Sequence, residues 1–337
     1  MPDPIERPPT VAPGAAGDPD VVVREHRDAI DVIDREVLAR LNERASHARA
    51  IGALKADSGG PAWRPEREAQ VLARLTGGNP GPLSNEQVVA VFRQVMSACL
   101  ALEQKLRIAF LGPAGTFSHA AVMRQFGQFV DTLPCVTIDE IFRVGEGSRA
   151  DYAVVPVENS TEGAVGRTLD LMCSTELSIC GEIKLRVQQN LLSNAPALDH
   201  VAKVYSHAQS LAQCAQWLAR RLPGAARVPV SSNAEAARLA AGEEGSAAIA
   251  GEIASSIYGL RVLASHIEDE PNNSTRFWVL GRQNVPASGD DKTSLVMSAP
   301  NRPGAVHALL APFADHGVSM TRFESRPART GLWEYLF

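Results

Sequence analysis

Apolar residues in the first hundred positions recur at helical spacing. Between Val21 and Asp57 they stand at every third or fourth residue, with no proline in between: Ile30, Ile33, Val37, Leu41, Ala45, Ala48, Ile51 and Leu54. This pattern predicts one helix of more than thirty residues, which is long for a compact domain and needs a partner along its length. A second helix is expected from Pro65 to Gly77. A third is expected from Ser84, which has capping-box spacing to Gln87, to about Lys105.

The pattern changes after residue 106. Short apolar runs that end in turn residues predict buried strands at 107–113, 151–159, 203–207, 247–251 and 276–282. Alanine-rich helical stretches lie between them, for example 210–222 and 232–242, so we expect an α/β region with a largely parallel sheet. A strand at 293–299, a helix at 304–316 and two more strands follow. The predicted parts are a disordered tail (1–19), an all-α domain (20–106), an α/β domain (107–283), a linker (284–291) and an α+β piece (292–337).

Composition excludes several classes of protein. The net charge is −5 and the chain has no basic block, which argues against a nucleic-acid partner. The first twenty residues have no basic, apolar signal segment, and no apolar run approaches the roughly 18–20 residues of a membrane span. We therefore expect a cytoplasmic protein, in which the triplets at Asn272 and Asn273 are not glycan acceptors. The five scattered cysteines indicate neither a disulfide framework nor a metal site.

Three basic residues on the predicted long helix suggest an anion site. Arg44 and Lys55 are about 20° from the same face and about 16 Å apart along the axis, so their side chains can reach toward one small anion. Arg27 lies roughly 25 Å further back. If Arg27 takes part, it must come from a second copy packed antiparallel. The alternative is that all three are solvated surface charges.

Polar loops follow three of the predicted strands: Gly112–Ala121, Val157–Val165 and Asn272–Phe277. The first has neither Gly-Lys-Ser/Thr nor GxGxxG, so it is not a phosphate loop. Its backbone N–H groups and the hydroxyls of Thr116 and Ser118 suit a carboxylate at a helix N-terminus. Each loop taken alone is compatible with ordinary turn chemistry. Together they favour one cleft between two lobes, in which hydroxyl and amide groups assist the loss of a leaving group from an anion.

The helical region resembles a chorismate mutase domain of the intertwined-dimer type. The matching residues are Arg27, the run IDVID, NER ending at Arg44, Lys55, RPERE with Glu68, and Cys99 and Glu103. The resemblance implies a pericyclic rearrangement that uses no cofactor or metal, in a homodimer formed through the long helix. It implies that seven residues bind chorismate: Arg27, Arg44, Lys55, Arg64, Glu68, Cys99 and Glu103.

Roles within this set also follow from the resemblance. Arg44 and the partner subunit's Arg27 would hold the two carboxylates. Lys55 and Glu103 would donate to the ether oxygen, and Glu103 can do so only when it is protonated. Glu68 would hold a substrate hydroxyl. Cys99 stands where other members have Ser.

Residues 107–283 resemble the prephenate dehydratase family, on the motifs GPAGTFS, VENSTEG, SHAQSLAQC and STRF. The resemblance implies a two-lobed fold similar to type II periplasmic binding proteins, and decarboxylation of prephenate with loss of the ring hydroxyl. Thr275 would donate to the departing hydroxyl, with Arg276 nearby for a carboxylate and Phe277 packed beneath. The predicted prephenate-binding residues are Thr116, Ser118, Asn159, Ser160, Thr161, Thr275, Arg276 and Phe277.

Residues 292–337 resemble the start of an ACT regulatory domain. NRPGAVHALL and ESRP correspond to loops that bind phenylalanine in such enzymes, which implies an effector site at Asn301, Pro303, Gly304, Ala305, Glu324, Ser325, Arg326 and Pro327. A complete domain needs a further helix and strand. We therefore expect weakened or absent inhibition by phenylalanine in a chain that ends at Phe337.

The whole pattern resembles the bifunctional chorismate mutase–prephenate dehydratase family of phenylalanine biosynthesis. A close alternative is a dehydratase whose helical domain mainly dimerises and has weak mutase activity. A distant alternative is a non-catalytic amino-acid sensor built on the two-lobed fold. The sensor does not explain why Arg44, Lys55, Glu68 and Glu103 accompany STRF.

Overall fold

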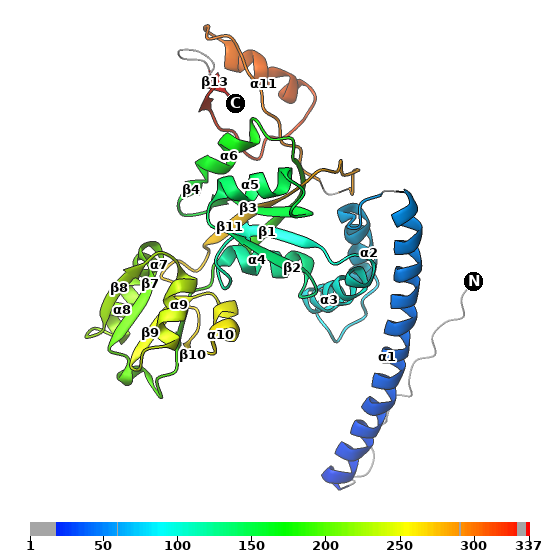
Figure 1. The fold of residues 1–337 in the computed structure, drawn as a ribbon, viewed down its shortest axis with the longest axis vertical. Coiled ribbons are helices and arrows are strands. Elements are labelled where there is room, and N and C mark those ends of the chain that lie inside the picture. Colours follow the sequence, from blue (N-terminus) through cyan, green and yellow to red (C-terminus); the bar gives the residue numbers. More distant parts are fainter. Residues whose placement is uncertain (1–17, 59, 290, 329–334) are drawn as a thin grey trace.

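The computed structural model describes residues 18–58, 60–289, 291–328 and 335–337. The predicted disordered tail lies almost wholly outside these residues. Among the described helices, none is both long enough and apolar enough to cross a membrane. The molecule has a helical region, two α/β lobes and a small C-terminal segment (Figure 1).

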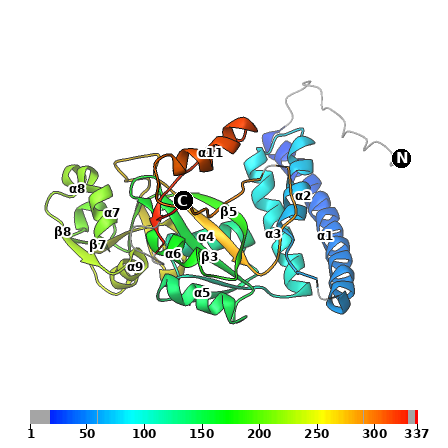
Figure 2. The same cartoon turned by 90° about the horizontal axis from the view of Figure 1, so that it is seen from above.

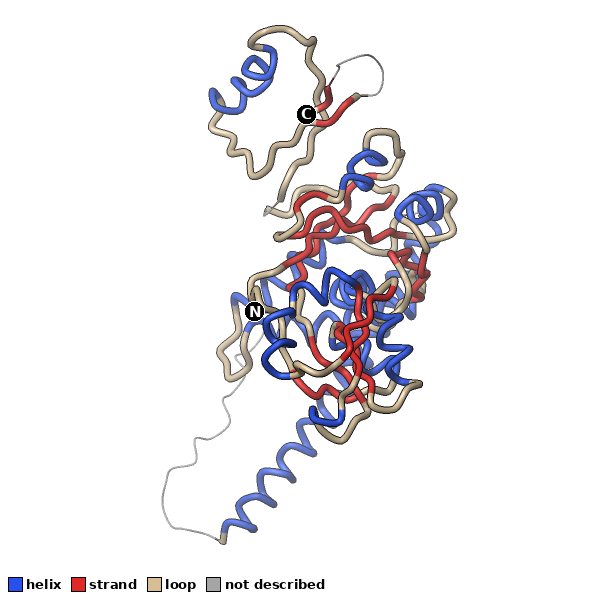
Figure 3. The backbone as a smooth tube through the Cα atoms, turned by 90° about the vertical axis from the view of Figure 1, so that its left-hand side faces the viewer, coloured by secondary structure: helices blue, strands red, loops and turns tan. Residues whose placement is uncertain are grey.

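The helical region consists of α1 (Pro19–Ser58), α2 (Pro65–Gly77) and α3 (Asn85–Glu103). The predicted capping box is present, because the Gln87 amide donates to Ser84 Oγ and the Ser84 amide donates to Gln87 Oε1. At 1.5 Å per residue, α1 is about 60 Å long. Its N-terminal half extends beyond α2 and α3 (Figures 1 and 3).

The first lobe has a central sheet with strand order β2-β1-β3-β11-β5, and β4 pairs with β3. The strands are β1 (Arg107–Leu111), β2 (Asp131–Cys135), β3 (Tyr152–Asn159), β4 (Gly163–Ala164), β5 (Ser178–Arg186) and β11 (Ser274–Gly281). Helix α4 (Phe117–Phe126) packs on one face, where Ile108 and Phe110 point. Helices α5 (Ile138–Glu146) and α6 (Gly166–Met172) pack on the other face, where Ala109 points. Alternate residues of β1 therefore belong to different cores, as strand geometry requires.

The second lobe repeats this three-layer design. Its sheet has the order β10-β6-β9-β7-β8, built from β6 (Asn190–Ser193), β7 (Lys203–His207), β8 (Ala226–Val230), β9 (Ser246–Ala250) and β10 (Arg261–Ala264). Helices α7 (Ala208–Gln213) and α8 (Ala215–Arg221) cover one face, and α9 (Asn233–Ala241) and α10 (Glu252–Tyr258) cover the other. A short 3-10 helix, Leu198–His200, precedes β7. The predicted two-lobed α/β architecture is confirmed (Figure 2).

The expectation of a largely parallel sheet is wrong. In the first lobe β1 is parallel to β2 and β3, but β11 runs antiparallel to both β3 and β5. In the second lobe β6 is antiparallel to both β9 and β10. The reason is the chain path: β5 leads out of the first lobe and β11 returns to it from the second, so β11 enters the sheet in the opposite direction to β3. The strand apolarity predicts burial and carries no information about direction.

The C-terminal segment contains α11 (Ala305–Asp315), β12 (Arg326–Pro327) and β13 (Tyr335–Leu336). The predicted helix at 304–316 is confirmed, with Gly304 as its N-cap. The predicted strand at 293–299 is wrong, because the described residues there form only an isolated bridge between Ser298 and Leu336. Leu295 and Val296 are more than half exposed, so this apolar run has no core to cover.

The helical region and the first lobe share one hydrophobic core. Trp63, from the loop between α1 and α2, is 5 % exposed and packs against Phe126 and Tyr152 with ring centroids 4.8 and 5.0 Å apart. The Trp63 carbonyl accepts hydrogen bonds from Tyr152 Oη and Gln283 Nε2. The loop is therefore fixed by residues of the neighbouring lobe.

Candidate active sites

A cavity of about 580 Å³ lies between α1, α2 and α3. Six of the seven residues predicted for the helical site line it: Arg44, Lys55, Arg64, Glu68, Cys99 and Glu103. They come from three helices and the loop that precedes α2. The structure thus brings together residues that are up to 59 positions apart in the chain, and it makes a strongly charged cavity suited to an anion.

Lys55 and Glu103 meet inside this cavity. Lys55 Nζ is 3.5 Å from Glu103 Oε2 and also donates to the Ala62 carbonyl at 3.4 Å. Their helices approach closely because residue 52 is glycine: a Cβ there would lie 2.6 Å from Glu103 Cγ. Gly52 therefore allows α3 to deliver Glu103 next to Lys55.

Glu68 is a largely enclosed acid of the cavity, with a side chain 13 % exposed. Its Oε2 accepts a hydrogen bond of 2.8 Å from Trp63 Nε1. Its Oε1 is 3.4 Å from Arg93 Nε and accepts from Gln125 Nε2 at 3.4 Å. Burial raises the pKa of the Glu68 carboxyl, and the Trp63 donor and the Arg93 charge oppose that rise.

Sequence reasoning missed several residues of this cavity. Arg93 could have been found, because Arg93, Met96, Leu100 and Glu103 recur at helical spacing on one face of α3. Trp63 and Gln125 carry no such signal. Gln125 belongs to α4 of the first lobe, so it reaches the cavity only because the lobe docks on α3.

Arg27 is not among the described residues that line the cavity. It lies seventeen positions before Arg44 on the same unbroken helix, which corresponds to about 25 Å. The surrounding part of α1 exposes apolar side chains on one face, with Ile30, Ile33 and Val37 about half exposed. The contact of Arg27 with the site stays a prediction that requires a second copy.

The second candidate site lies where β3 and β11 pair. These strands place Thr275 directly opposite Asn159. Asn159 Nδ2 donates to Thr275 Oγ1 and to Asn273 Oδ1, both at 2.9 Å. Ser160 Oγ donates to Asn273 Oδ1 at 3.3 Å, and the Ser274 amide donates to Ser160 Oγ. Two of the three predicted loops therefore form one hydrogen-bonded cluster.

The cluster leaves Thr275 prepared to act as a donor. A threonine hydroxyl that accepts one hydrogen bond still has its own proton to give. Asn159 is itself held in place, because its Oδ1 accepts from the Thr161 amide at 3.0 Å, from the Thr161 hydroxyl at 2.5 Å and from the Glu162 amide at 3.2 Å. Asn273 is 3 % exposed, so its amide forms the buried support of the cluster.

Arg276 faces away from this cluster. Successive residues of a strand point to opposite faces, and Arg276 pairs with acids on the other side, 3.3 Å from Glu158 and 3.8 Å from Glu182. The structure does not bring Arg276 beside the Thr275 hydroxyl as the resemblance implies. Phe277 follows a register shift in the strand and is 1 % exposed in the core of the first lobe.

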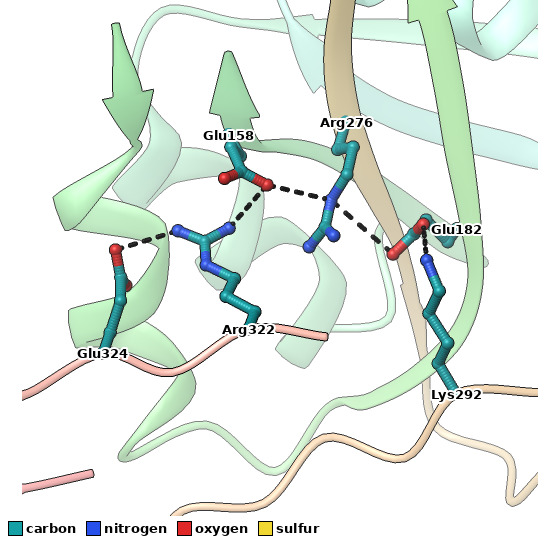
Figure 4. A network of polar contacts seen from close by, with 6 residues as sticks. All are labelled: Glu158, Glu182, Arg276, Lys292, Arg322 and Glu324. Carbon is teal, nitrogen blue, oxygen red and sulfur yellow. Dashed lines mark hydrogen bonds and ion pairs between the residues drawn. The ribbon is translucent and has the colours of Figure 1, made fainter. Parts of the chain in front are cut away.

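The same acids connect the sheet to the C-terminal segment (Figure 4). Arg322 Nη1 is 2.9 Å from Glu158, and Arg322 Nη2 is 2.9 Å from Glu324. Lys292 Nζ is 2.9 Å from Glu182. A row of alternating charges thus joins the residue next to Thr275 to the predicted effector loop.

The first predicted loop makes different contacts. The hydroxyl of Thr116 caps α4: it accepts from the His119 amide and donates to the Leu111 carbonyl. Ser118 is buried at the start of α4. Tyr258 of the second lobe donates to the Ala114 carbonyl at 2.8 Å, so this loop lies at the contact between the lobes. Burial lowers the pKa of His119, whose ring stacks on Phe110, so it is neutral at pH 7.

The predicted effector residues divide into two groups. Asn301 and Ala305 line a small cavity of about 70 Å³ together with Tyr335 and Phe337, and Pro303 and Gly304 lie in the turn that begins α11. Glu324 pairs with Arg322, while Arg326 pairs with Asp170 and donates to the Gly166 carbonyl at 2.8 Å. Ser325 and Pro327 lie in the same run. Within this run, Arg326 therefore binds α6 of the first lobe.

Within the described residues, no group of three or more His, Cys, Asp or Glu side chains is arranged to hold a metal ion. All five cysteines carry free thiols. The two candidate sites are therefore described by arginine, lysine, carboxyl, amide and hydroxyl groups.

Three family models match the chain. Residues 26–104 match chorismate mutase type II, residues 108–285 match prephenate dehydratase, and residues 293–337 match the ACT domain.

Several relatives carry the names of both enzymes in one description. A bifunctional chorismate mutase/prephenate dehydratase of Neisseria gonorrhoeae is 57 % identical over 321 residues, which is 94 % of this chain and 88 % of that protein. The protein of the same name from Pseudomonas aeruginosa is 48 % identical over 91 % of this chain and 86 % of that protein. The Escherichia coli K12 protein is 34 % identical over 92 % and 86 %.

Two solved structures resemble the lobes. Prephenate dehydratase from Arthrobacter aurescens, in complex with L-Phe, has a TM-score of 0.59 at 31 % identity and covers 68 % of this chain and 78 % of that one. Prephenate dehydratase from Staphylococcus aureus has a TM-score of 0.58 at 28 % identity, over 68 % and 87 %.

Proposed function

This chain belongs to the family of bifunctional chorismate mutase/prephenate dehydratases, and we propose that it converts chorismate to prephenate and prephenate to phenylpyruvate in phenylalanine biosynthesis. The observation that carries the first half is the helical cavity, which gathers Arg44, Lys55, Glu68 and Glu103 around one space. The second half is supported by the pairing of Thr275 with Asn159.

In the cavity, the substrate's own atoms exchange bonds and the protein supplies no nucleophile. Catalysis then requires holding the reactive conformer and stabilising charge on the ether oxygen as its bond to carbon breaks. Arg44 pairs with a carboxylate, Lys55 and protonated Glu103 donate to the ether oxygen, and Glu68 accepts from the ring hydroxyl. The 3.5 Å distance between Lys55 Nζ and Glu103 Oε2 places both groups at one point of the cavity.

The second carboxylate is bound by the partner's Arg27 in a homodimer. Arg27 is too far from Arg44 on the same helix to share a small substrate, whereas an antiparallel copy of α1 brings it to the opposite site. The exposed apolar face around Ile30, Ile33 and Val37 suits such packing. A symmetric dimer then contains two equal sites, each made of residues from both chains.

At the end of β3 and the start of β11, prephenate loses its carboxylate and its ring hydroxyl. The electron pair of the broken C–CO2 bond enters the ring, and the C–O bond breaks as the ring becomes aromatic. Thr275 donates its proton to the departing hydroxyl, which leaves as water, and a proton from solvent restores the threonine hydroxyl. Asn159 holds the threonine oxygen, and the side chains of Ser160 and Thr161 lie beside it for the carboxylates.

The C-terminal segment is the place for an effector, and we assign L-phenylalanine to Asn301, Gly304 and the ESRP run. The Arthrobacter aurescens relative was solved with L-Phe bound. We also assign the protein to the cytoplasm, where five free thiols are typical. Fractionation of the native cells checks the location.

One assay tests both activities. Chorismate is supplied to the pure protein, and prephenate and phenylpyruvate are followed separately. The proposal requires prephenate to appear first and phenylpyruvate to follow. Phenylpyruvate formed from added prephenate but not from chorismate would favour a dehydratase whose helical region only dimerises. Formation of neither product would favour a non-catalytic sensor.

A further inference from the structure

The helical cavity is not built by the helical region alone. Its wall includes Gln125 and Phe126, the last two residues of α4 in the first lobe. It also includes Trp63, which comes from the α1–α2 loop but is buried among residues of that lobe. The lobe that carries the second reaction therefore forms one side of the first site.

Helix α3 and the end of α4 are joined by two hydrogen bonds and by a close approach of their backbones at Gly127. The Gln128 amide donates to Gln94 Oε1 at 3.1 Å, and the Phe129 amide donates to Ser97 Oγ at 3.2 Å. At Gly127, where φ is +73°, a Cβ would lie 2.6 Å from Ser97 Cβ. Only glycine suits both this backbone conformation and this approach, so α4 is held in one position against the cavity.

Both oxygens of Glu68 are engaged by groups that the lobe holds in place. Trp63 Nε1 donates to Oε2 at 2.8 Å, and the indole is clamped between Phe126 and Tyr152. Gln125 Nε2 donates to Oε1 at 3.4 Å. The Trp63 donor is buried, and the Gln125 donor comes from the end of a helix that is held against α3.

Building on the proposed function, we propose that Trp63 and Gln125 are positioning residues of the mutase site, through which the dehydratase lobe orients the Glu68 carboxylate toward the hydroxyl of chorismate. Neither residue touches the reacting atoms. They act by fixing the acceptor and by keeping it ionised, because donors to a carboxylate favour its charged form.

The ionisation of Glu68 determines how mutase activity should change with pH. Burial raises its pKa, and the Trp63 hydrogen bond and the Arg93 charge lower it. The charged form is the competent acceptor, so mutase activity falls as the pH drops through this pKa. Loss of the indole donor raises the pKa further and moves that acid limb to higher pH. Other charged or titratable groups face the same cavity: Arg44, His47, Lys55, Arg64, Glu66, Arg67 and Glu103.

Two variants remove the donors while keeping shape. Trp63→Phe keeps an aromatic ring in the core, and Gln125→Met keeps the length of the side chain. A hydrogen bond to a charged group contributes roughly 1.5–3 kcal/mol, so Trp63→Phe should raise KM for chorismate about tenfold or more. Gln125→Met, which loses a longer bond, should raise it about threefold. Activity on added prephenate should stay within about twofold in both.

Matched controls are available in the chain. Gln128→Met changes an exposed glutamine three residues beyond Gln125. Trp217→Phe changes a half-buried tryptophan of the second lobe. Both controls should leave the KM for chorismate and its pH profile unchanged.

A double-mutant cycle separates positioning from general damage. In a Glu68→Ala background, Gln125→Met should have no further effect, because the carboxylate that it orients is absent. Unchanged KM and an unmoved acid limb in both donor variants would overturn the proposal. Equal loss of both activities, or fully additive effects in the cycle, would also overturn it.

A measurement that does not depend on catalysis tests the contact between Trp63 and Glu68 separately from the proposed function. The indole N–H resonance of Trp63 should titrate with Glu68 in the wild-type protein and should stop titrating in Glu68→Gln. A titrating resonance in a protein that makes no prephenate would reject the mutase function but support the contact. A resonance that does not respond to pH would reject the contact whatever the activity.

Discussion

The helical cavity and the cluster at the end of β3 and the start of β11 differ in charge and in construction. The cavity collects arginine, lysine and carboxyl groups from α1, α2 and α3, and α4 adds Gln125 and Phe126. The cluster consists of hydroxyl and amide groups from two paired strands in register. The first must hold a dianion in one conformation, which takes fixed charges. The second must give a proton to a leaving group, which takes one well-placed hydroxyl.

Construction also decides how each site responds to change. The strand cluster depends on backbone pairing that is complete within the first lobe, so single side chains there can be replaced without moving the frame. The cavity depends on the packing of separate helices, so a substitution at any residue that lines it can displace the charged side chains. We therefore expect sharp, local effects at the cluster and coupled effects at the cavity.

The largest effect is expected at Thr275. Thr275→Val removes the donor while keeping the shape, and loss of one transition-state donor costs about 10²–10³-fold. Phenylpyruvate formation should fall by at least about a hundredfold while chorismate consumption is unchanged, and Thr275→Ser should keep most of the activity. The exposed Thr293→Val is the control. Loss of both activities in a folded Thr275→Val protein would contradict the separation of the sites.

The next effect tests whether the cavity needs a second chain. Arg27→Ala and Arg44→Ala should each abolish mutase activity. After subunit exchange, their mixture should regain about a quarter of wild-type activity, because half of the dimers are mixed and each has one intact site. Arg35→Ala, an exposed change on the same helix, should be silent. Absence of recovery, with mixed dimers demonstrated by mass spectrometry, would reject the shared site.

A smaller effect is expected at Glu103. Its carboxyl group belongs to the cavity and has no counterpart among the hydroxyl and amide groups of the strand cluster. Glu103 can donate to the ether oxygen only when it carries a proton. Glu103→Gln keeps a permanent donor and should retain most of the mutase activity, whereas Glu103→Ala should lower it. Glu86→Gln, at an exposed position of α3, is the control. An unchanged kcat/KM for chorismate in Glu103→Ala would show that Glu103 is not the donor.

The smallest effect is expected in the charge row beside Thr275. Arg322→Gln breaks the pairs with Glu158 and Glu324, whose side chains are about one-third exposed. Exposed ion pairs contribute roughly 0–1 kcal/mol, so the KM for prephenate should change by less than about fivefold and mutase kinetics should not change. Arg282→Gln is the exposed control. A hundredfold loss would show that Arg276 needs this row to serve the dehydratase site.

The sequence by itself determined the features that are coded within one turn of helix or one strand. The capping box of Ser84 and Gln87, the start of α2 at Pro65 and the unbroken α1 follow from neighbouring residues, because capping and periodicity act over three or four positions. The basic positions of α1 and the polar loops after β3 and before β11 were predicted from the same local patterns, whereas Glu103 of α3 followed from the family resemblance.

Tertiary structure decided which of these residues share a site. Gln125 lies 57 positions from Glu68, and Tyr152 lies 89 positions from Trp63, yet each pair is hydrogen-bonded or in the same core. The direction of β11, and with it the side of the sheet that Arg276 faces, depends on the path of the chain through the second lobe. Such contacts arise when separately formed elements bury apolar surface against each other. Apolar residues in a sequence indicate that a surface will be buried, but they do not identify the element that it packs against.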